Sequence, residues 1–95
     1  MKKKEYRITN TVILVVCGDD FAILNRRPSD NGIFGITFSF PVKSWMVKDI
    51  ENSGIASVES FNDDGLLTFS RKPFFETYLM IDVLTSIIEK YETLR

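Results

Sequence analysis

The feature that most constrains this chain is the segment at residues 33–40, in which apolar and small residues alternate from Phe34 onward. Successive side chains of a β-strand point to opposite faces of a sheet, so alternate residues of this segment share a face. The apolar set is Phe34, Ile36, Phe38 and Phe40, and the set between them is Gly35, Thr37 and Ser39. We therefore expect a sheet that places one face in the core and leaves the other in solvent.

Four other segments have the composition of strands. Residues 6–17 are rich in Thr, Val and Ile, and a Gly-Asp-Asp turn joins them to residues 21–26 in a hairpin. Residues 55–61 and 66–71 form a second hairpin around an Asp-Gly pair. Residues 27–32 are dense in turn residues and include a proline, which predicts a loop.

Two further segments repeat apolar residues at helical spacing. The first begins at Pro41, which suits a first helical turn because no amide donor is needed there, and it ends near Ser53. Gly54 fits a left-handed position after the helix, with Ile50 and Ile55 placed for the hydrophobic contact of a Schellman motif. The buried face of this helix should comprise Val42, Trp45, Met46 and Ile50.

The second helix is expected from Pro73 to the C-terminus and is apolar over much of its circumference. Its main stripe comprises Met80, Leu84, Ile87, Ile88, Tyr91 and Leu94, and it is widened by Phe75, Tyr78, Leu79 and Val83. A surface helix needs an apolar stripe of only about 100°, so this helix is either deeply buried or shared with a partner. The sequence alone leaves both alternatives open.

The elements follow one another as three strands, a helix, two strands and a helix, without a linker or an internal repeat. We predict an α+β fold in which an antiparallel sheet of about five strands carries both helices on one face. With 95 residues, of which 44% are hydrophobic, the chain fits one domain over residues 1–95 with a single core.

The composition lacks residue types that enzymes and metalloproteins commonly use. The chain has no histidine and one cysteine, so it lacks the commonest general base, the commonest metal ligand and any internal disulfide. We expect Cys17 to be buried in a strand, and the pairs Asp19 with Asp20 and Asp63 with Asp64 to stabilise turns. The sequence therefore predicts a binding protein without catalytic residues, metal or cofactor.

The N-terminus combines three lysines with a short apolar run at residues 12–17, as a secretion signal would. The run is shorter than the roughly 7–15 residues of a signal peptide, and no stretch approaches the roughly 18 apolar residues of a membrane helix. A single cysteine also fits a reducing compartment. We expect a cytoplasmic protein that does not bind membranes.

The polar side of the predicted sheet suggests nucleic-acid binding. Its hydroxyls would come from Thr9, Thr11, Thr37, Ser39, Ser57, Thr68 and Ser70. Cationic donors to a phosphate backbone would come from two strand ends, with Arg26 and Arg27 at one and Arg71 and Lys72 at the other. The net charge is −1, from 12 basic and 13 acidic residues, so such a site would be a local patch. The alternative is an ordinary polar surface, since Thr is favoured on exposed strands.

A protein partner is the other interpretation. Phe61 and Leu66 flank the Asp-Gly turn, and Tyr78 lies on the wide stripe of the last helix. Exposed apolar groups at either place would form an interaction patch for a host protein, whereas Phe61 and Leu66 could equally close the core. Self-association, giving a homodimer, is a further alternative.

Short stretches of the chain, with the order of elements over residues 6–94, resemble one family. The stretches are AILNRR at residues 22–27 and NSGIASVESFNDDGLLTFSRK at residues 52–72. They are similar to the C-terminal double-wing domain of the MotA transcription activators of T-even bacteriophages, in which a saddle-shaped sheet backed by helices binds duplex DNA. The resemblance implies a phage-type regulatory protein in the host cytoplasm. The positions that it places near DNA are Arg26, Arg27, Thr68, Ser70 and Arg71.

Overall fold

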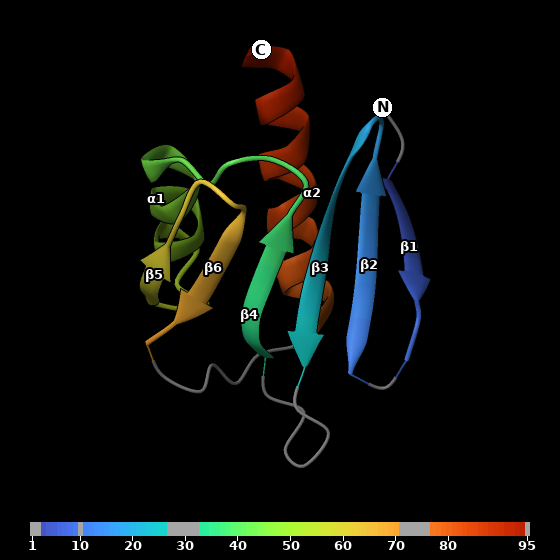
Figure 1. Cartoon of the computed structure of the whole chain (residues 1–95), viewed down its shortest axis with the longest axis horizontal. Coiled ribbons are helices and arrows are strands. Elements are labelled where there is room, and N and C mark those ends of the chain that lie inside the picture. Colours follow the sequence, from blue (N-terminus) through green and yellow to red (C-terminus); the bar gives the residue numbers. More distant parts are fainter. Residues whose placement is uncertain (1–2, 10, 27–32, 71–76, 95) are drawn as a thin grey trace.

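The computed structural model describes residues 3–9, 11–26, 33–70 and 77–94, with the backbone alone for residues 3–5, 7, 26, 33, 34 and 77. Within these residues the chain forms one antiparallel sheet and two helices (Figure 1). The elements are β1 (Lys3–Arg7), β2 (Val12–Cys17), β3 (Asp20–Arg26), β4 (Ile33–Phe38), α1 (Ser44–Asn52), β5 (Val58–Phe61), β6 (Leu66–Phe69) and α2 (Thr77–Leu94). The order across the sheet is β1-β2-β3-β4-β6-β5, so β1 and β5 are its edges.

The predicted α+β class with an antiparallel sheet is confirmed, and the described sheet has six strands. The extra strand arises because residues 6–17, expected as one strand, divide into β1 and β2. Thr9 makes the turn between them: its side-chain oxygen accepts the amides of Thr11 at 3.0 Å and Val12 at 3.1 Å. Composition did not reveal this turn, since threonine is favoured in strands as well as in such hydroxyl-capped turns.

The core lies between one face of the sheet and the two helices. α2 packs on β2 and β3, while α1 packs on α2 and β5, and both helices lie behind the strands in the view of Figure 1. The strand residues buried on this side include Ile13, Val15, Cys17, Ala22, Leu24, Ile36, Phe38, Leu67 and Phe69. The alternation predicted for residues 33–40 is confirmed from Ile36 to Phe40, where Ile36, Phe38 and Phe40 are buried and Thr37 and Ser39 are not; the side chains of Ile33 and Phe34 lie outside the described set.

The middle of α2 is deeply buried, which decides between the two alternatives for its wide apolar stripe. Its buried residues are Met80, Ile81, Leu84, Thr85, Ile87 and Ile88. Tyr91 stacks on the ring of Phe40 at 4.0 Å between centroids. Only the two ends of the helix expose large apolar side chains among the described residues, at Tyr78, Leu79 and Leu94. The predicted start at Pro73 and the predicted stripe residue Phe75 lie outside the described residues.

α1 begins at Ser44, three residues later than expected. The predicted start at Pro41 is wrong because the chain there is still held in extended form, with the Val42 amide donating to the Asn62 carbonyl of the β5–β6 turn. The end of the helix matches the prediction more closely. Gly54 has a φ of 77°, and its amide donates to the Glu51 carbonyl. The second Schellman bond is replaced by one from the Ile55 amide to Ser53 Oγ at 3.3 Å.

The β5–β6 turn holds the far side of the sheet together. The side-chain oxygen of Asn62 accepts the amides of Asp64 at 2.9 Å and Leu66 at 3.1 Å, so Asn62 rather than the acidic pair organises this turn. Gly65 follows with a φ of 89°. The predicted strands at 55–61 and 66–71 are shorter in the structure, and the predicted loop at 27–32 lies outside the described residues.

Candidate functional site

The face of the sheet turned away from the helices is not covered by any described element. Paired residues of an antiparallel sheet share a face, so the register lets this surface be traced strand by strand. One row crosses five strands through the pairs of Tyr6 with Leu14, Leu14 with Ile23, Ile23 with Thr37, and Thr37 with Leu66. We call this the central row. Figure 1 looks onto this side of the sheet.

Two further rows flank the central row. The first comprises Val16, Phe21 and Ser39, and the second comprises Val12, Asn25, Gly35, Thr68 and Ser60. Lys4 continues the first row onto β1, although its side chain is outside the described set. The three rows together are called the open face below.

The open face is apolar over β1, β2 and β3. Tyr6 is 49% exposed and Phe21 37%, and between them Val12, Leu14, Val16 and Ile23 are half-buried. Leu66 on β6 is 42% exposed and ends the central row. The prediction of a polar outer face is therefore wrong for this half of the sheet. The signal was in the sequence: the run at residues 12–17 is apolar at every position, a pattern typical of strands buried on both faces.

The predicted hydroxyl surface exists over β4 and β6 only. Thr37, Ser39, Thr68 and Ser70 lie on the open side of these strands and none is fully buried. Their hydrogen bonds are already made within the chain. The Thr68 and Ser60 hydroxyls are 2.6 Å apart, and the side-chain amide of Asn25 donates to the Thr37 hydroxyl at 3.5 Å.

The other predicted hydroxyls are arranged differently. Ser39 Oγ donates to the buried carboxylate of Asp20 at 2.9 Å, and Ser70 Oγ donates to the Ser57 carbonyl at 3.3 Å. Thr9 and Thr11 belong to the β1–β2 turn, where their hydroxyls contact each other at 2.9 Å. A backbone of phosphates would therefore meet hydroxyls that are engaged with protein groups.

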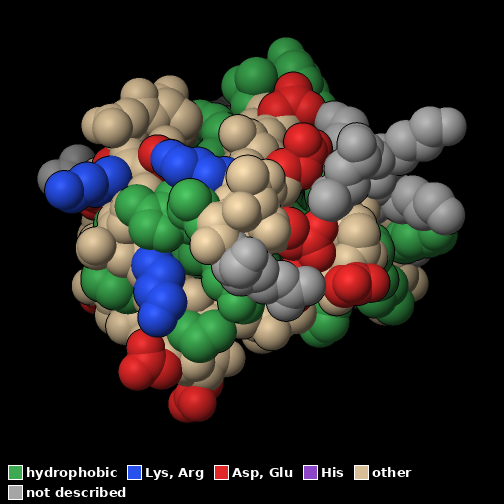
Figure 2. Space-filling model, turned by 90° about the horizontal axis from the view of Figure 1, so that it is seen from above, with side chains coloured by type: hydrophobic (Ala, Val, Ile, Leu, Met, Phe, Trp, Pro, Cys, Tyr) green, Lys and Arg blue, Asp and Glu red, His purple; other side chains and the backbone are tan. Residues whose placement is uncertain are grey.

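The cationic half of the predicted nucleic-acid site is not described. Arg26 ends β3 with its backbone alone, and Arg27, Arg71 and Lys72 lie outside the described residues. The three lysines with described side chains are Lys43, Lys48 and Lys90, all in or beside the helices. Figure 2, looking onto the end of the molecule, shows lysine side chains on the α1 side, with acidic side chains both beside them and across the rest of the view.

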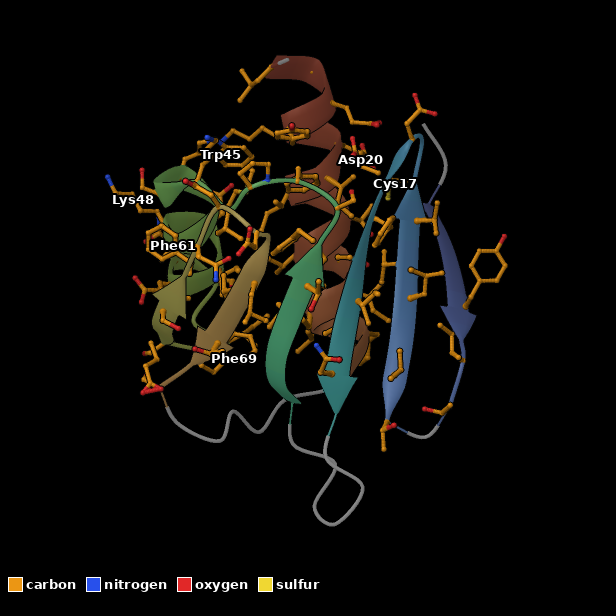
Figure 3. The ribbon with its side chains drawn as sticks, in the orientation of Figure 1. Cys17, Asp20, Trp45, Lys48, Phe61 and Phe69 are labelled. Carbon is orange, nitrogen blue, oxygen red and sulfur yellow. The ribbon has the colours of Figure 1, made fainter. Side chains whose placement is uncertain are left out.

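The three residues predicted to bind a partner do not form one patch. Phe61 pairs with the buried Leu67 and so belongs to the helix side of the sheet, where Figure 3 places it beside α1. Leu66 pairs with Thr37 and belongs to the open face. Tyr78 is 62% exposed at the start of α2. Phe61 and Leu66 flank the same turn, but because side chains alternate along a strand they lie on opposite faces of the sheet.

The described helices also border two hollows. A groove of about 490 Å³ between α1 and α2 has Asp49, Asp82 and Ser86 in its lining, and Asp49 pairs with Lys90 at 3.6 Å. Lys90 also lies 4.8 Å above the centre of the Trp45 ring. A pocket of about 180 Å³ beside Trp45 and Tyr91 is smaller than the roughly 300–1,000 Å³ of ligand sites.

Cys17 is fully buried in the core of β2, as predicted. In the described part of the chain, no group of three or more Cys, Asp or Glu side chains could hold a metal ion. No described helix is long and apolar enough to span a bilayer.

No protein-family model, curated protein or solved structure matches this chain. The resemblance to the MotA double-wing domain therefore stays a prediction.

Proposed function

We propose that this chain is a small binding protein that packs the apolar part of its open face against another protein surface. The observation that supports the proposal is the central row, in which Tyr6 and Leu66 are exposed and Leu14 and Ile23 are half-buried across the sheet. Each square ångström of apolar surface removed from water is worth roughly 25 cal/mol, and contiguous apolar patches on soluble proteins commonly mark interaction sites.

The face of the sheet is a better candidate than its edges. β1 has the sequence KKEYR, and charged residues on an edge strand oppose the addition of another strand. β5 has four residues and an irregular register between Val58 and Ser60, which also makes it a poor template. A partner would therefore bind through side chains of the open face rather than by extending the sheet. We place this protein in the cytoplasm, in keeping with its single cysteine.

Site-specific photo-crosslinking tests the proposal. A photo-reactive amino acid replaces Leu14 or Ile23 on the open face, and the matched control replaces Leu79, which is exposed on α2. Irradiation in the producing cells should give protein adducts from the two sheet positions and not from the control. Adducts should disappear when Thr37, in the middle of the same face, is changed to Arg. Equal labelling from all three positions, or none from the sheet positions, contradicts the proposal.

Binding of duplex DNA is the second candidate, and the position of Thr68 and Ser70 on the open side of β6 favours it. In this hypothesis Arg26, Arg27, Arg71 and Lys72 hold phosphates while the hydroxyls set the register. Replacement of phosphate counterions makes such binding fall steeply with salt. Affinity for duplex DNA should drop at least about tenfold between 50 and 200 mM salt, and should also drop when the four basic residues become Ala. An affinity that neither change alters rules this candidate out.

A further inference from the structure

We infer that the occupant of the open face is a second copy of this chain, with the two sheets packed face to face about a two-fold axis. The inference rests on the proposed function and names its partner. Three properties of the open face support it: its charge, its extent and the symmetry of its central row.

The first property is charge. A two-fold interface uses the same patch on both copies, so a patch with charges of one sign would repel its own counterpart. None of the side chains described in the three rows is charged; they are aliphatic, aromatic, hydroxyl or amide groups. Lys4, at the β1 end of the first row, is a cation on this face, and the axis described below brings the β1 end of one copy opposite β6 of the other, so Lys4 does not face its own counterpart. Two copies can therefore approach through this face without placing like charges opposite each other. A strongly basic or acidic partner, such as a nucleic acid, would gain little from it.

The second property is extent. Strands lie about 4.8 Å apart and rise about 3.3 Å per residue, so the three rows, spaced two residues apart over five strands, outline roughly 400 Å². Relief of the side chains raises the accessible area that two copies bury to roughly 1,000–1,200 Å², about the minimum for a specific protein interface. Under the axis described below, the hydroxyl groups over β4 and β6 of one copy lie opposite the apolar side chains over β1 and β2 of the other, so the interface is uncharged and mixed around an apolar centre at Ile23.

The third property is the symmetry of the central row. Ile23 is its middle residue, and the two ends, Tyr6 and Leu66, are its most exposed members. A two-fold axis over Ile23, running along β3, places Tyr6 of one copy against Leu66 of the other. Leu14 then faces Thr37 of the second copy. Sheets packed in this way lie about 10 Å apart at a small crossing angle and exclude water from their inner faces.

Sedimentation equilibrium over a concentration range gives the first test. The wild type should reach twice its mass of 10.9 kDa, and Ile23→Lys should raise the dimer Kd by about a hundredfold because it buries an unpaired ammonium. Leu79→Lys, which also removes an exposed leucine but on α2, should leave the Kd unchanged. Circular dichroism confirms that each variant is folded, and Thr37→Arg provides a second disruptive variant if Ile23→Lys is not. A wild type that stays monomeric at millimolar concentration overturns the inference.

Crosslinking through introduced cysteines tests the axis itself. Because Cys17 is fully buried, a thiol reagent that spans about 10 Å should act only on the added cysteines. Ile23→Cys should crosslink to its own copy, whereas Tyr6→Cys and Leu66→Cys should crosslink with each other in a mixture and not with themselves. Self-crosslinking of Tyr6→Cys overturns the proposed axis. If the chain is monomeric and the photo-adducts at Ile23 have the mass of a different protein, the occupant of the open face is not a second copy. The proposed function, binding of a protein through this face, would then still hold.

Discussion

At the scale of single residues, Gly65 is the position where the backbone tolerates the least change. Its φ of 89° lies in the left-handed region that glycine favours. A Cβ added there would collide with the Phe38 carbonyl oxygen and lie 2.9 Å from that of Phe40. The Gly65 carbonyl in turn accepts the Phe38 amide at 2.7 Å. The glycine thus lets the β5–β6 turn lie directly on the end of β4.

We predict that Gly65→Ala lowers the free energy of unfolding by at least about 3 kcal/mol, from backbone strain and displaced carbonyls together. Gly54→Ala is the matched control, because Gly54 has a φ of 77° but no atom within 4 Å of the added Cβ. It should cost only about 1 kcal/mol. Urea denaturation measures both variants. Equal losses would mean that the close approach of the two carbonyls contributes nothing.

Residue chemistry predicted some local features better than others. The left-handed glycine after α1 and the burial of Cys17 followed from residue type and neighbours, and both are confirmed. The turn at Thr9 was missed because its hydroxyl satisfies backbone amides, a role that a strand-like composition hides. The opposite directions of Phe61 and Leu66 depend on the pairing register, which turn chemistry alone does not fix.

At the scale of elements, β6 provides a direct measure of the two faces of the sheet. Leu66 is 42% exposed on the open face, whereas its neighbour Leu67 is fully buried against the helices. We predict that Leu67→Ala costs about 2–5 kcal/mol of unfolding free energy, as large-to-small changes in a core do. Leu66→Ala should cost about 0.5 kcal/mol when measured at concentrations where the chain is monomeric. Similar losses at the two positions would show that the open face is buried within the monomer.

α2 is joined to the sheet by a polar contact as well as by its apolar side. The Glu92 carboxylate accepts the Asp19 amide at 3.1 Å, so the last turns of the helix hold the β2–β3 turn. We predict that Glu92→Ala lowers the free energy of unfolding by about 1 kcal/mol and speeds hydrogen exchange at the Asp19 amide. Glu92→Gln keeps an acceptor oxygen and should retain much of the protection. Unchanged exchange in Glu92→Ala would mean that this contact does not hold the turn.

Helices and strands were predicted from the sequence where the spacing of apolar residues and a turn or helix-ending residue indicated the same boundary. Both helices, the two hairpins and the common side of the helices followed from the spacing of apolar residues and are confirmed. The start of α1 was placed too early because Pro41 is compatible with a helix but Val42 is held by Asn62, a long-range contact. The candidate site was harder to predict. Its apolar character follows from β2 and β3, whereas the hydroxyl and basic residues of the sequence point to β4 and β6.

At the scale of the whole molecule, a dimer through the open face would join stability to protein concentration. A folded state that exists partly as a dimer gains stability by mass action as the concentration rises. A chain of 95 residues shifts its Tm by roughly 4–8 °C per kcal/mol, and a tenfold rise in concentration is worth about 0.7 kcal/mol per chain of a fully formed dimer. The wild-type Tm should therefore rise by about 3–6 °C for each tenfold increase above the dimer Kd.

The variant Ile23→Lys separates this effect from aggregation or changes in the core. Ile23 is half-buried on the open face, so a lysine there can extend into solvent in the monomer while opposing the approach of a second copy. Its Tm should be independent of concentration, while Leu79→Lys should keep the slope of the wild type. Calorimetry across a hundredfold range of concentration measures all three chains. A wild-type Tm that does not move with concentration contradicts the dimer, since no equilibrium between one and two copies can be insensitive to mass action.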